Sequence, residues 1–233
     1  MSVQAKLLSL YDSFPFHRHP LWNAVLSGQF SLKQVVAAEI QHCIRTAAGQ
    51  KLRAAAVSEA QAVSPTIFAA VLDTYLEECT GHDGMPSHLD MIKALVLAAG
   101  GTEQDIRDTR PTPGNAAAMA LYRDIGQRGA ACHILGAGAV EHYYSALCPR
   151  IYQAYTGRYG MSSDAAQTYL IHGPMDQEHA ARALLIADEA VEIHGWPVVE
   201  QCVSDAFVAT SLHYDGMYQA ATGRNVFWDG VSE

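Results

Sequence analysis

The sequence is poor in lysine, with only four among its 233 residues, and its formal net charge is −9 at pH 7. Proteins that bind nucleic acid need a basic surface facing the phosphates, so we expect no nucleic-acid partner. No apolar run reaches the roughly 18 residues that a membrane span needs. The first residues, MSVQAKLLSLYDSF, also lack the charged-then-apolar layout of a signal peptide. The sequence therefore predicts no membrane partner and a cytoplasmic location.

Cysteine is present but without a pattern. The five cysteines are odd in number, widely spread and contain no CxxC pair. This spacing predicts neither a disulfide framework nor a thiolate zinc site. We expect most of them to be small buried hydrophobic residues. They are Cys43, Cys79, Cys132, Cys148 and Cys202.

Alternating strand patterns, β-α-β units and internal repeats are also missing, whereas apolar residues recur at helical spacing. Ser31 is expected to cap a long helix over 32–62, Ser64-Pro65 to begin the next helix, and Ser87 to cap a third. The polar segment 102–114 is interpreted as a surface connection. The prediction is a single all-α domain over residues 1–233, with about seven or eight helices.

A further helix is expected over 132–160, and Ser163 or Asp164 should cap the next one. In that helix His172, Asp176 and His179 stand at positions i, i+4 and i+7, within an arc of roughly 60°. Two imidazoles and a carboxylate suit iron, manganese or zinc. The alternative is a solvated face with two histidines by chance, and the apolar residues around the triplet weaken it. The Gly173-Pro174 pair should kink or loosen the helix.

Other acidic residues could complete such a site. Glu141 lies on a helix that otherwise looks buried, where a lone carboxylate is costly unless it is paired or bound. Glu77 and Glu78 end one helix and His88 begins the next, so a carboxylate and an imidazole can approach one point. For Glu77, Glu78 and His88, the alternative is a charged residue at a helix end that is exposed to water.

A second geometry is also open. Glu39 and His42 have the Glu-x-x-His spacing of ferritin-like di-iron bundles, and Asp176 and His179 would be their counterpart. That arrangement leaves His172 unexplained, which makes it our second choice.

These residues resemble a known family. The segments HPLWNAVLSGQFS and HLDMIKALVLAAGG, with the Glu141 helix and the triplet after it, are similar to the haem-oxygenase-like superfamily that includes thiaminase II and pyrroloquinoline quinone synthase. Within it, the chain is most similar to the haem-oxygenase-like di-iron oxidases. The resemblance implies six metal ligands, with Glu77 as an alternative to the first. They are Glu78, His88, Glu141, His172, Asp176 and His179.

The resemblance also implies the function. It predicts a haem-oxygenase-like bundle that holds two Fe(II), uses O2 as co-substrate and acts on a small, amino-acid-like substrate in a biosynthetic pathway. The reactions of similar proteins are N-oxygenation, desaturation, C–C cleavage and nitrile formation. The resemblance allows for an electron donor and suggests a homodimer. A substrate carboxylate would need a basic partner, and five arginines are candidates: Arg45, Arg53, Arg123, Arg150 and Arg158. Tyr144 and Tyr152 could line the pocket.

Rival functions remain. A thiaminase II-like enzyme would use Cys132 as nucleophile, although nothing marks it as a thiolate and no partner glutamate is obvious in the last helix. A pyrroloquinoline quinone synthase-like enzyme needs a basic pocket, which the net charge does not suggest. A haem oxygenase proper would need a proximal histidine, for which His17, His19 and His42 are ambiguous candidates. A helical interaction protein would bind no metal and expose an apolar patch.

Overall fold

The polypeptide folds into helices only. A computed structural model describes residues 1–81 and 84–231, and it contains twelve α-helices and no strand in that part of the chain. The prediction of an all-α fold is confirmed, and the predicted count of seven or eight helices is wrong. The helices are α1 Val3–Ser9, α2 Pro20–Ser27, α3 Leu32–Val63, α4 Pro65–Tyr75, α5 His88–Ala98, α6 Glu103–Asp108, α7 Pro113–Gln127, α8 Ala130–Tyr144, α9 Cys148–Gly157, α10 Gln167–Leu185, α11 Ala187–His194 and α12 Trp196–Thr222. Two 3-10 turns, Leu10–Ser13 and Phe16–Arg18, and a π-helical turn, Leu76–Thr80, complete the set.

The additional helices arise from local signals that the sequence analysis missed. The expected surface connection 102–114 contains α6, because Thr102 and Asp105 form a reciprocal capping box. The expected helix 132–160 is broken between α8 and α9, just before Pro149. The cap expected at Ser163 or Asp164 is also wrong, since α10 begins at Gln167 without a side-chain cap.

Other capping signals act as predicted. Ser31 and Gln34 form a capping box at the start of α3, with Ser31 N–H donating to Gln34 Oε1 over 2.9 Å. Ser64 caps α4, where Pro65 is the first residue, and Ser87 caps α5. These caps satisfy backbone N–H groups that have no partner inside the helix.

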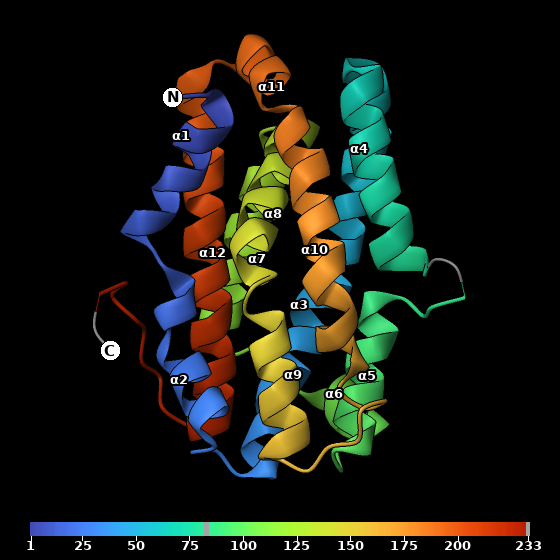
Figure 1. Cartoon of the computed structure of the whole chain (residues 1–233), viewed down its shortest axis with the longest axis vertical. Helices are drawn as coiled ribbons and strands as arrows, with labels where there is room; N and C mark the ends of the chain where they lie inside the picture. Colours follow the sequence, from blue (N-terminus) through green and yellow to red (C-terminus); the bar gives the residue numbers. More distant parts are fainter. Residues whose placement is uncertain (82–83, 232–233) are drawn as a thin grey trace.

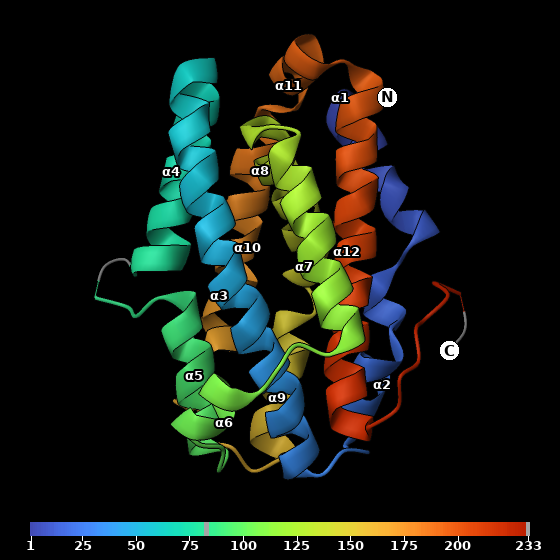
Figure 2. The ribbon, with the colours of Figure 1, turned by 180° about the vertical axis from the view of Figure 1, so that it is seen from behind.

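The long helices run along the longest axis of the molecule (Figure 1). At about 1.5 Å per residue, α3 spans roughly 48 Å, which is most of that length. Helix α12 packs along α7, α3 and α8, while α10 packs along α8 and α9. From behind, α3 and α7 are nearest to the viewer (Figure 2). The helices α3, α8, α10 and α12 therefore surround the interior in which the polar residues below are found.

Aromatic side chains join the N-terminal segment to the bundle. The ring of Tyr11 stacks on that of Tyr143 in α8, with ring centroids 3.6 Å apart, and meets Phe207 of α12 edge-on at 5.3 Å. Trp22 of α2 meets Tyr214 of α12 edge-on at 4.9 Å. Aromatic pairs of this kind contribute beyond the area they bury, so the N-terminal segment is part of the core.

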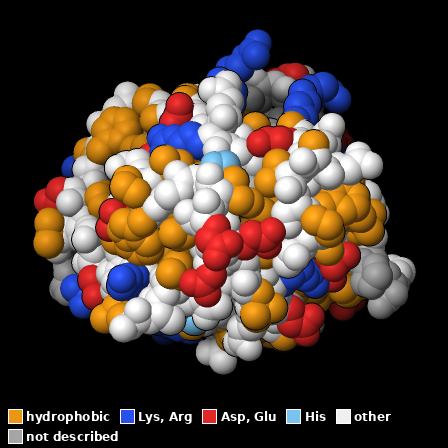
Figure 3. Space-filling view, turned by 90° about the horizontal axis from the view of Figure 1, so that it is seen from above, with side chains coloured by type: hydrophobic (Ala, Val, Ile, Leu, Met, Phe, Trp, Pro, Cys, Tyr) orange, Lys and Arg blue, Asp and Glu red, His pale blue; other side chains and the backbone are white. Residues whose placement is uncertain are grey.

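The surface at the α11 end of the bundle is acidic. Seen from above, acidic side chains gather near the middle of this end (Figure 3), and α11 carries Asp188, Glu189 and Glu192.

Among the residues described, none of the helices is both long and apolar enough to span a bilayer.

Helices α8 and α10 approach each other closely at Gly138. A Cβ atom added to Gly138 would lie 2.3 Å from the Cβ of Ala183 in α10. The two helices can keep this separation only if position 138 has no side chain.

We therefore expect Gly138→Ala to push α10 away from α8 and to lower the free energy of unfolding by about 1–3 kcal/mol, the usual cost of overpacking. A chain of this size should then lose roughly 2–4 °C in Tm per kcal/mol. Thermal unfolding followed by circular dichroism measures the change. The control is Gly157→Ala, at an exposed helical position with no heavy atom within 4 Å of the added Cβ. Equal Tm values for the two variants would contradict the packing argument.

Candidate metal centre

Helix α10 carries the predicted triplet into the interior. His172, Asp176 and His179 lie on its inner face and are 3 %, 3 % and 0 % exposed. His172 Nδ1–H donates to the carbonyl oxygen of Thr168 over 2.7 Å, which leaves Nε2 as its free ligand atom. The triplet is therefore buried, and the alternative of a solvated face is wrong.

The π-helical turn Leu76–Thr80 brings two consecutive glutamates against α10. Glu78 Oε1 is 3.3 Å from His172 Nε2, and Glu77 Oε2 is 2.9 Å from His179 Nε2. A π turn is wider than an α turn and is common at functional sites. Both carboxylates therefore reach the ligand helix from one turn.

His88, the first residue of α5, lies beside Glu78 and His172. Its Nδ1 is 2.9 Å from Glu78 Oε2, and its ring lies 3.9 Å from the ring of His172. As the sequence suggested, a Glu and a His from two segments meet here. The Coulombic effect of His88 and Arg53 outweighs burial, so the pKa of Glu78 lies well below its usual value.

Two groups of three residues have ligand atoms within 4.8 Å of one another. The first is Glu78, His88 and His172, and the second is Glu78, Asp176 and His179. Glu78 belongs to both groups, as a carboxylate bridging two cations would. As metal ligands these residues stay a prediction, but the described part of the chain brings them together.

Glu141 of α8 faces the second group. Its Oε2 lies 3.6 Å from His179 Nδ1. Both atoms are buried and have no hydrogen-bond partner among the described residues. Buried polar atoms without partners are costly, and a cation between the two would satisfy both. The residues present therefore fit a metal ion.

The two neighbouring glutamates have different contacts. Glu77 accepts hydrogen bonds from His179 Nε2 and from two guanidinium nitrogens of Arg182, at 2.9 and 3.1 Å. Burial alone would raise the pKa of Glu77, but Arg182 outweighs it and lowers the pKa. Glu77 thus stays a carboxylate that holds the Nε2 proton of His179 and leaves Nδ1 for a metal. This is how a carboxylate outside the ligand shell orients a metal-binding histidine.

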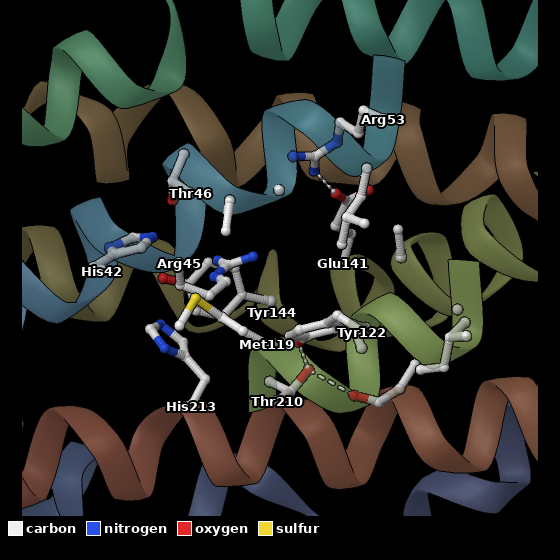
Figure 4. Close-up of a pocket in the computed structure, with 18 of the residues that line it drawn as sticks. His42, Arg45, Thr46, Arg53, Met119, Tyr122, Glu141, Tyr144, Thr210 and His213 are labelled. Carbon is white, nitrogen blue, oxygen red and sulfur yellow. Dashed lines mark hydrogen bonds and ion pairs between the residues drawn. The ribbon is translucent and has the colours of Figure 1, made fainter. Parts of the chain in front are cut away.

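Arg53 of α3 supplies positive charge within the site. Its Nη2 lies 3.4 Å from Glu78 Oε2 and 3.7 Å from Glu141 Oε1, as the dashed contact in Figure 4 shows for Glu141. From the sequence, Arg53 was expected only as a possible partner of a substrate carboxylate. Its contact with two carboxylates from other helices depends on tertiary structure, and the local sequence carries no signal for it.

The pKa values of the three remaining predicted ligands are raised. Burial would lower the pKa of His172, but the hydrogen bond and charge of Glu78 outweigh it and raise the pKa to about 9. Burial, followed by the charge of Glu78, raises the pKa of Glu141 to about 8. Burial also raises the pKa of Asp176 well above its usual value. At pH 7, protons on His172 and Glu141 therefore occupy positions where a metal would bind.

Glu39 and His42 lie outside these groups. Both oxygens of Glu39 are engaged, Oε1 by the hydroxyls of Tyr155 and Tyr169 and Oε2 by His42 Nδ1. Glu39 therefore does not join Asp176 and His179 in the ferritin-like geometry of our second choice.

A cavity of about 340 Å3 adjoins the site and is lined in part by Glu78, His88, Glu141 and Asp176. Tyr144 lines it as expected, whereas Tyr152 is not among the lining residues. His213 of α12 also lines the cavity, and no pattern in the sequence pointed to this residue. The cavity gives a small substrate access to the predicted ligands.

Cys132 lies elsewhere. It is fully buried in an apolar cluster with Ile125, Cys202 and Ala206. A hydrogen bond with Cys202, together with burial, raises the pKa of the Cys132 thiol. A nucleophilic cysteine needs the opposite shift.

Comparison with known proteins places this geometry in context. A haem-oxygenase-like domain of unknown function from Shewanella denitrificans OS217 is 16 % identical and has a TM-score of 0.72, with 97 % of this chain and 95 % of that chain covered. A CADD-like protein of unknown function from Nostoc punctiforme PCC 73102 is 15 % identical, with a TM-score of 0.73 and coverage of 94 % and 96 %. A TenA family transcription regulator from Silicibacter sp. TM1040 is 15 % identical, with a TM-score of 0.69 and coverage of 94 % and 95 %.

At these identities the similarity shows the fold alone, which is haem-oxygenase-like as predicted. No curated protein matches the sequence. The model of a family described as iron-containing redox enzymes matches residues 40–203, more than two thirds of the chain. The protein belongs to this family of iron-containing redox enzymes.

Proposed function

We propose that the protein is a non-haem di-iron oxidase or oxygenase that activates O2 and acts on a small, amino-acid-like substrate in a biosynthetic pathway. The observation that carries the proposal is the sharing of Glu78 between two ligand groups. A single metal would need only one such group. We further propose that the chain acts as a homodimer in the cytoplasm, with an electron donor as a further partner.

The charges support two divalent cations. Three carboxylates, Glu78, Glu141 and Asp176, offset most of the charge of a di-ferrous pair, and three imidazoles supply nitrogen donors. When bound, such a pair supplies the redox chemistry with O2. The residues of the chain bind the ions, hold the substrate in the cavity and exclude water.

The rival functions have less support. A thiaminase II-like reaction would require a thiolate, whereas Cys132 is a buried thiol with a raised pKa. An interaction protein would need no buried cluster of ionisable groups, and such a cluster costs stability unless it is paired. A pyrroloquinoline quinone synthase-like reaction needs a basic pocket, whereas the basic side chains of this cavity face three carboxylates, and Glu78 and Glu141 already engage Arg53.

The first test is anaerobic titration with Fe(II), followed by rapid mixing with O2 while the visible absorption is recorded. We expect uptake of about two Fe(II) per chain and a transient absorption band. His172→Ala should lose the ion held with Glu78 and His88, and the transient with it. Exposed His142 on α8 offers a matched control, because His142→Ala should change neither result. No iron uptake by the wild type would contradict the proposal.

Substitution of each of the two neighbouring glutamates by glutamine tests their separate roles. Glu77→Gln should keep both ions but weaken the binding of one by about 10- to 100-fold, as for other carboxylates that orient a ligand histidine. Glu78→Gln removes the shared carboxylate and should abolish binding of both ions at micromolar Fe(II). Dissociation constants from the same anaerobic titration distinguish the two variants. The reverse ranking would make Glu77 the ligand.

Metal binding should strengthen as the pH rises. The raised pKa values of Glu141, about 8, and His172, about 9, mean that both hold protons at pH 7, which a metal must displace. Each displaced proton should change the apparent affinity by up to about tenfold per pH unit below its pKa, and the gain should level off near pH 9. Titration with Mn(II), which does not oxidise readily, between pH 6 and 9 with a pH indicator present measures affinity and proton release together. An affinity independent of pH would contradict this prediction.

A further inference from the structure

The cavity beside the predicted metal ligands contains a guanidinium that has no anionic partner among the described residues. Arg45 of α3 lines the cavity, and its Nε is buried without a hydrogen-bond partner in the described chain. Within residues 1–81 and 84–231, no carboxylate lies within ion-pair distance of it. Its guanidinium carbon is 6.0 Å from the ring centre of Tyr122. The hydroxyl of Thr46, the next residue, is also buried without a partner and faces the same cavity.

The other candidate arginines are less suitable. Arg53 is already engaged by Glu78 and Glu141. Arg123 lines the cavity but is exposed, Arg150 borders a separate depression and Arg158 packs beside Gly28 at the surface. The structure therefore selects Arg45 from the five.

His42 presents a hydrogen-bond acceptor to the same cavity. Its Nδ1 lies 3.1 Å from Glu39 Oε2. Because a carboxylate only accepts, the proton is on Nδ1 and the lone pair is on Nε2. Tyr155 and Tyr169 donate to the other oxygen of Glu39 and fix the carboxylate. No described residue bonds to Nε2 of His42.

His213 of α12 is fixed in the same way. Its Nδ1 lies 2.9 Å from Asn115 Oδ1. The amide nitrogen of Asn115 donates to the carbonyl oxygen and to Oε1 of Gln41, each over 2.9 Å, which identifies Oδ1 as the acceptor for His213. The lone pair of His213 is therefore also on Nε2, and no described residue occupies it. The rings of His42 and His213 are 5.6 Å apart.

These groups lie together. In Figure 4, His42, His213 and Arg45 occupy one end of the cavity, and Arg53 with Glu141 lies toward the other. His42 also meets the ring of His88 edge-on at 5.4 Å, so this end adjoins the predicted metal ligands. A cationic donor and two neutral acceptors thus face one enclosed space.

We propose that Arg45, His42 and His213 form the receptor for the head group of a free amino acid. The carboxylate binds the guanidinium of Arg45, and the ammonium donates to the Nε2 atoms of the two histidines. A zwitterion satisfies all three side chains, whereas a simple acid leaves both imidazoles unused and a simple amine leaves Arg45 unpaired. The inference rests on the proposed function for the reaction that follows, but the binding itself requires no iron.

Part of the remaining cavity wall is apolar and fits an apolar side chain, although Lys51, Arg123 and His133 also line the cavity. Met119, Ile125, Val140, Ala206 and Met217 contribute to its wall. The substrate class is therefore an amino acid with an aromatic or aliphatic side chain.

The test is isothermal titration of the full-length chain, both after chelation and after anaerobic loading with Fe(II). The probes are L-tryptophan, L-phenylalanine and L-leucine, each with its amine lacking the carboxylate and its acid lacking the amino group. We expect at least one amino acid to bind at least about tenfold more tightly than both of its analogues, because each analogue leaves a charged or polar group unpaired.

Two variants assign the contacts. Arg45→Met should weaken the binding of the amino acid by about 10- to 100-fold but leave the binding of the amine nearly unchanged. The control is Arg123→Met, which replaces an exposed arginine of the same cavity. His213→Phe should weaken the binding of the amino acid but not the binding of the acid that lacks the amino group. The control is His133→Phe. Circular dichroism shows whether each variant is folded. A variant whose structure is merely disturbed should weaken the binding of all three ligand types equally and would not give this pattern.

Several results would overturn the receptor: no amino acid binds, the simple acid binds as tightly as the amino acid, or Arg45→Met weakens the amine and the amino acid equally. These results are independent of the metal centre. Binding without iron uptake would contradict the di-iron function and leave the receptor in place. Iron uptake without amino-acid binding would contradict the receptor and leave the di-iron function in place.

Discussion

The interior of this bundle holds negative charge, and burying that charge is the constraint on which the rest of the site depends. Glu78, Asp176 and Glu141 converge from three different segments, at positions where an unpaired carboxylate is costly. The chain offsets this cost with Arg53, with histidines and with protons on Glu141 and His172. Two divalent ions would replace these with a stronger and more localised charge. The unpaired atoms of His179 and Glu141 mark where one of them would lie.

Helix packing sets how accurately these groups meet. The ligands come from α5, α8, α10 and the π-helical turn, so their separation depends on contacts between helices. Gly138, one turn before Glu141, lets α8 approach α10 at Ala183. Helix α3 then links the two ends of the cavity, because Arg53 contacts the metal centre while His42 and Arg45 lie at the proposed receptor. The predicted metal ligands and the proposed receptor are thus both contacted by side chains of one continuous helix.

The sequence predicted the fold class and the placement of His172, Asp176 and His179 on one buried helix face, because both depend on local periodicity. It did not predict that Glu77 contacts His179 and Arg182 while Glu78 contacts His88 and His172, since the π-helical turn that presents both glutamates has no clear local signature. The partners of Arg53 and the acceptor role of His213 depend on contacts between helices distant in sequence. Helix α6 was missed because its capping box lies in a proline-bearing segment that resembles a loop. The helix count was wrong for the same kind of reason, because short helices are specified by caps more than by periodicity.

The contacts of Arg53 have a consequence for how a metal would enter the site. Its guanidinium lies between Glu78 and Glu141, so these carboxylates have a counter-ion inside the bundle even when no metal is bound. A divalent ion would have to compete with Arg53 for the oxygens of Glu78 and Glu141. Metal binding and the position of the Arg53 side chain would therefore be coupled.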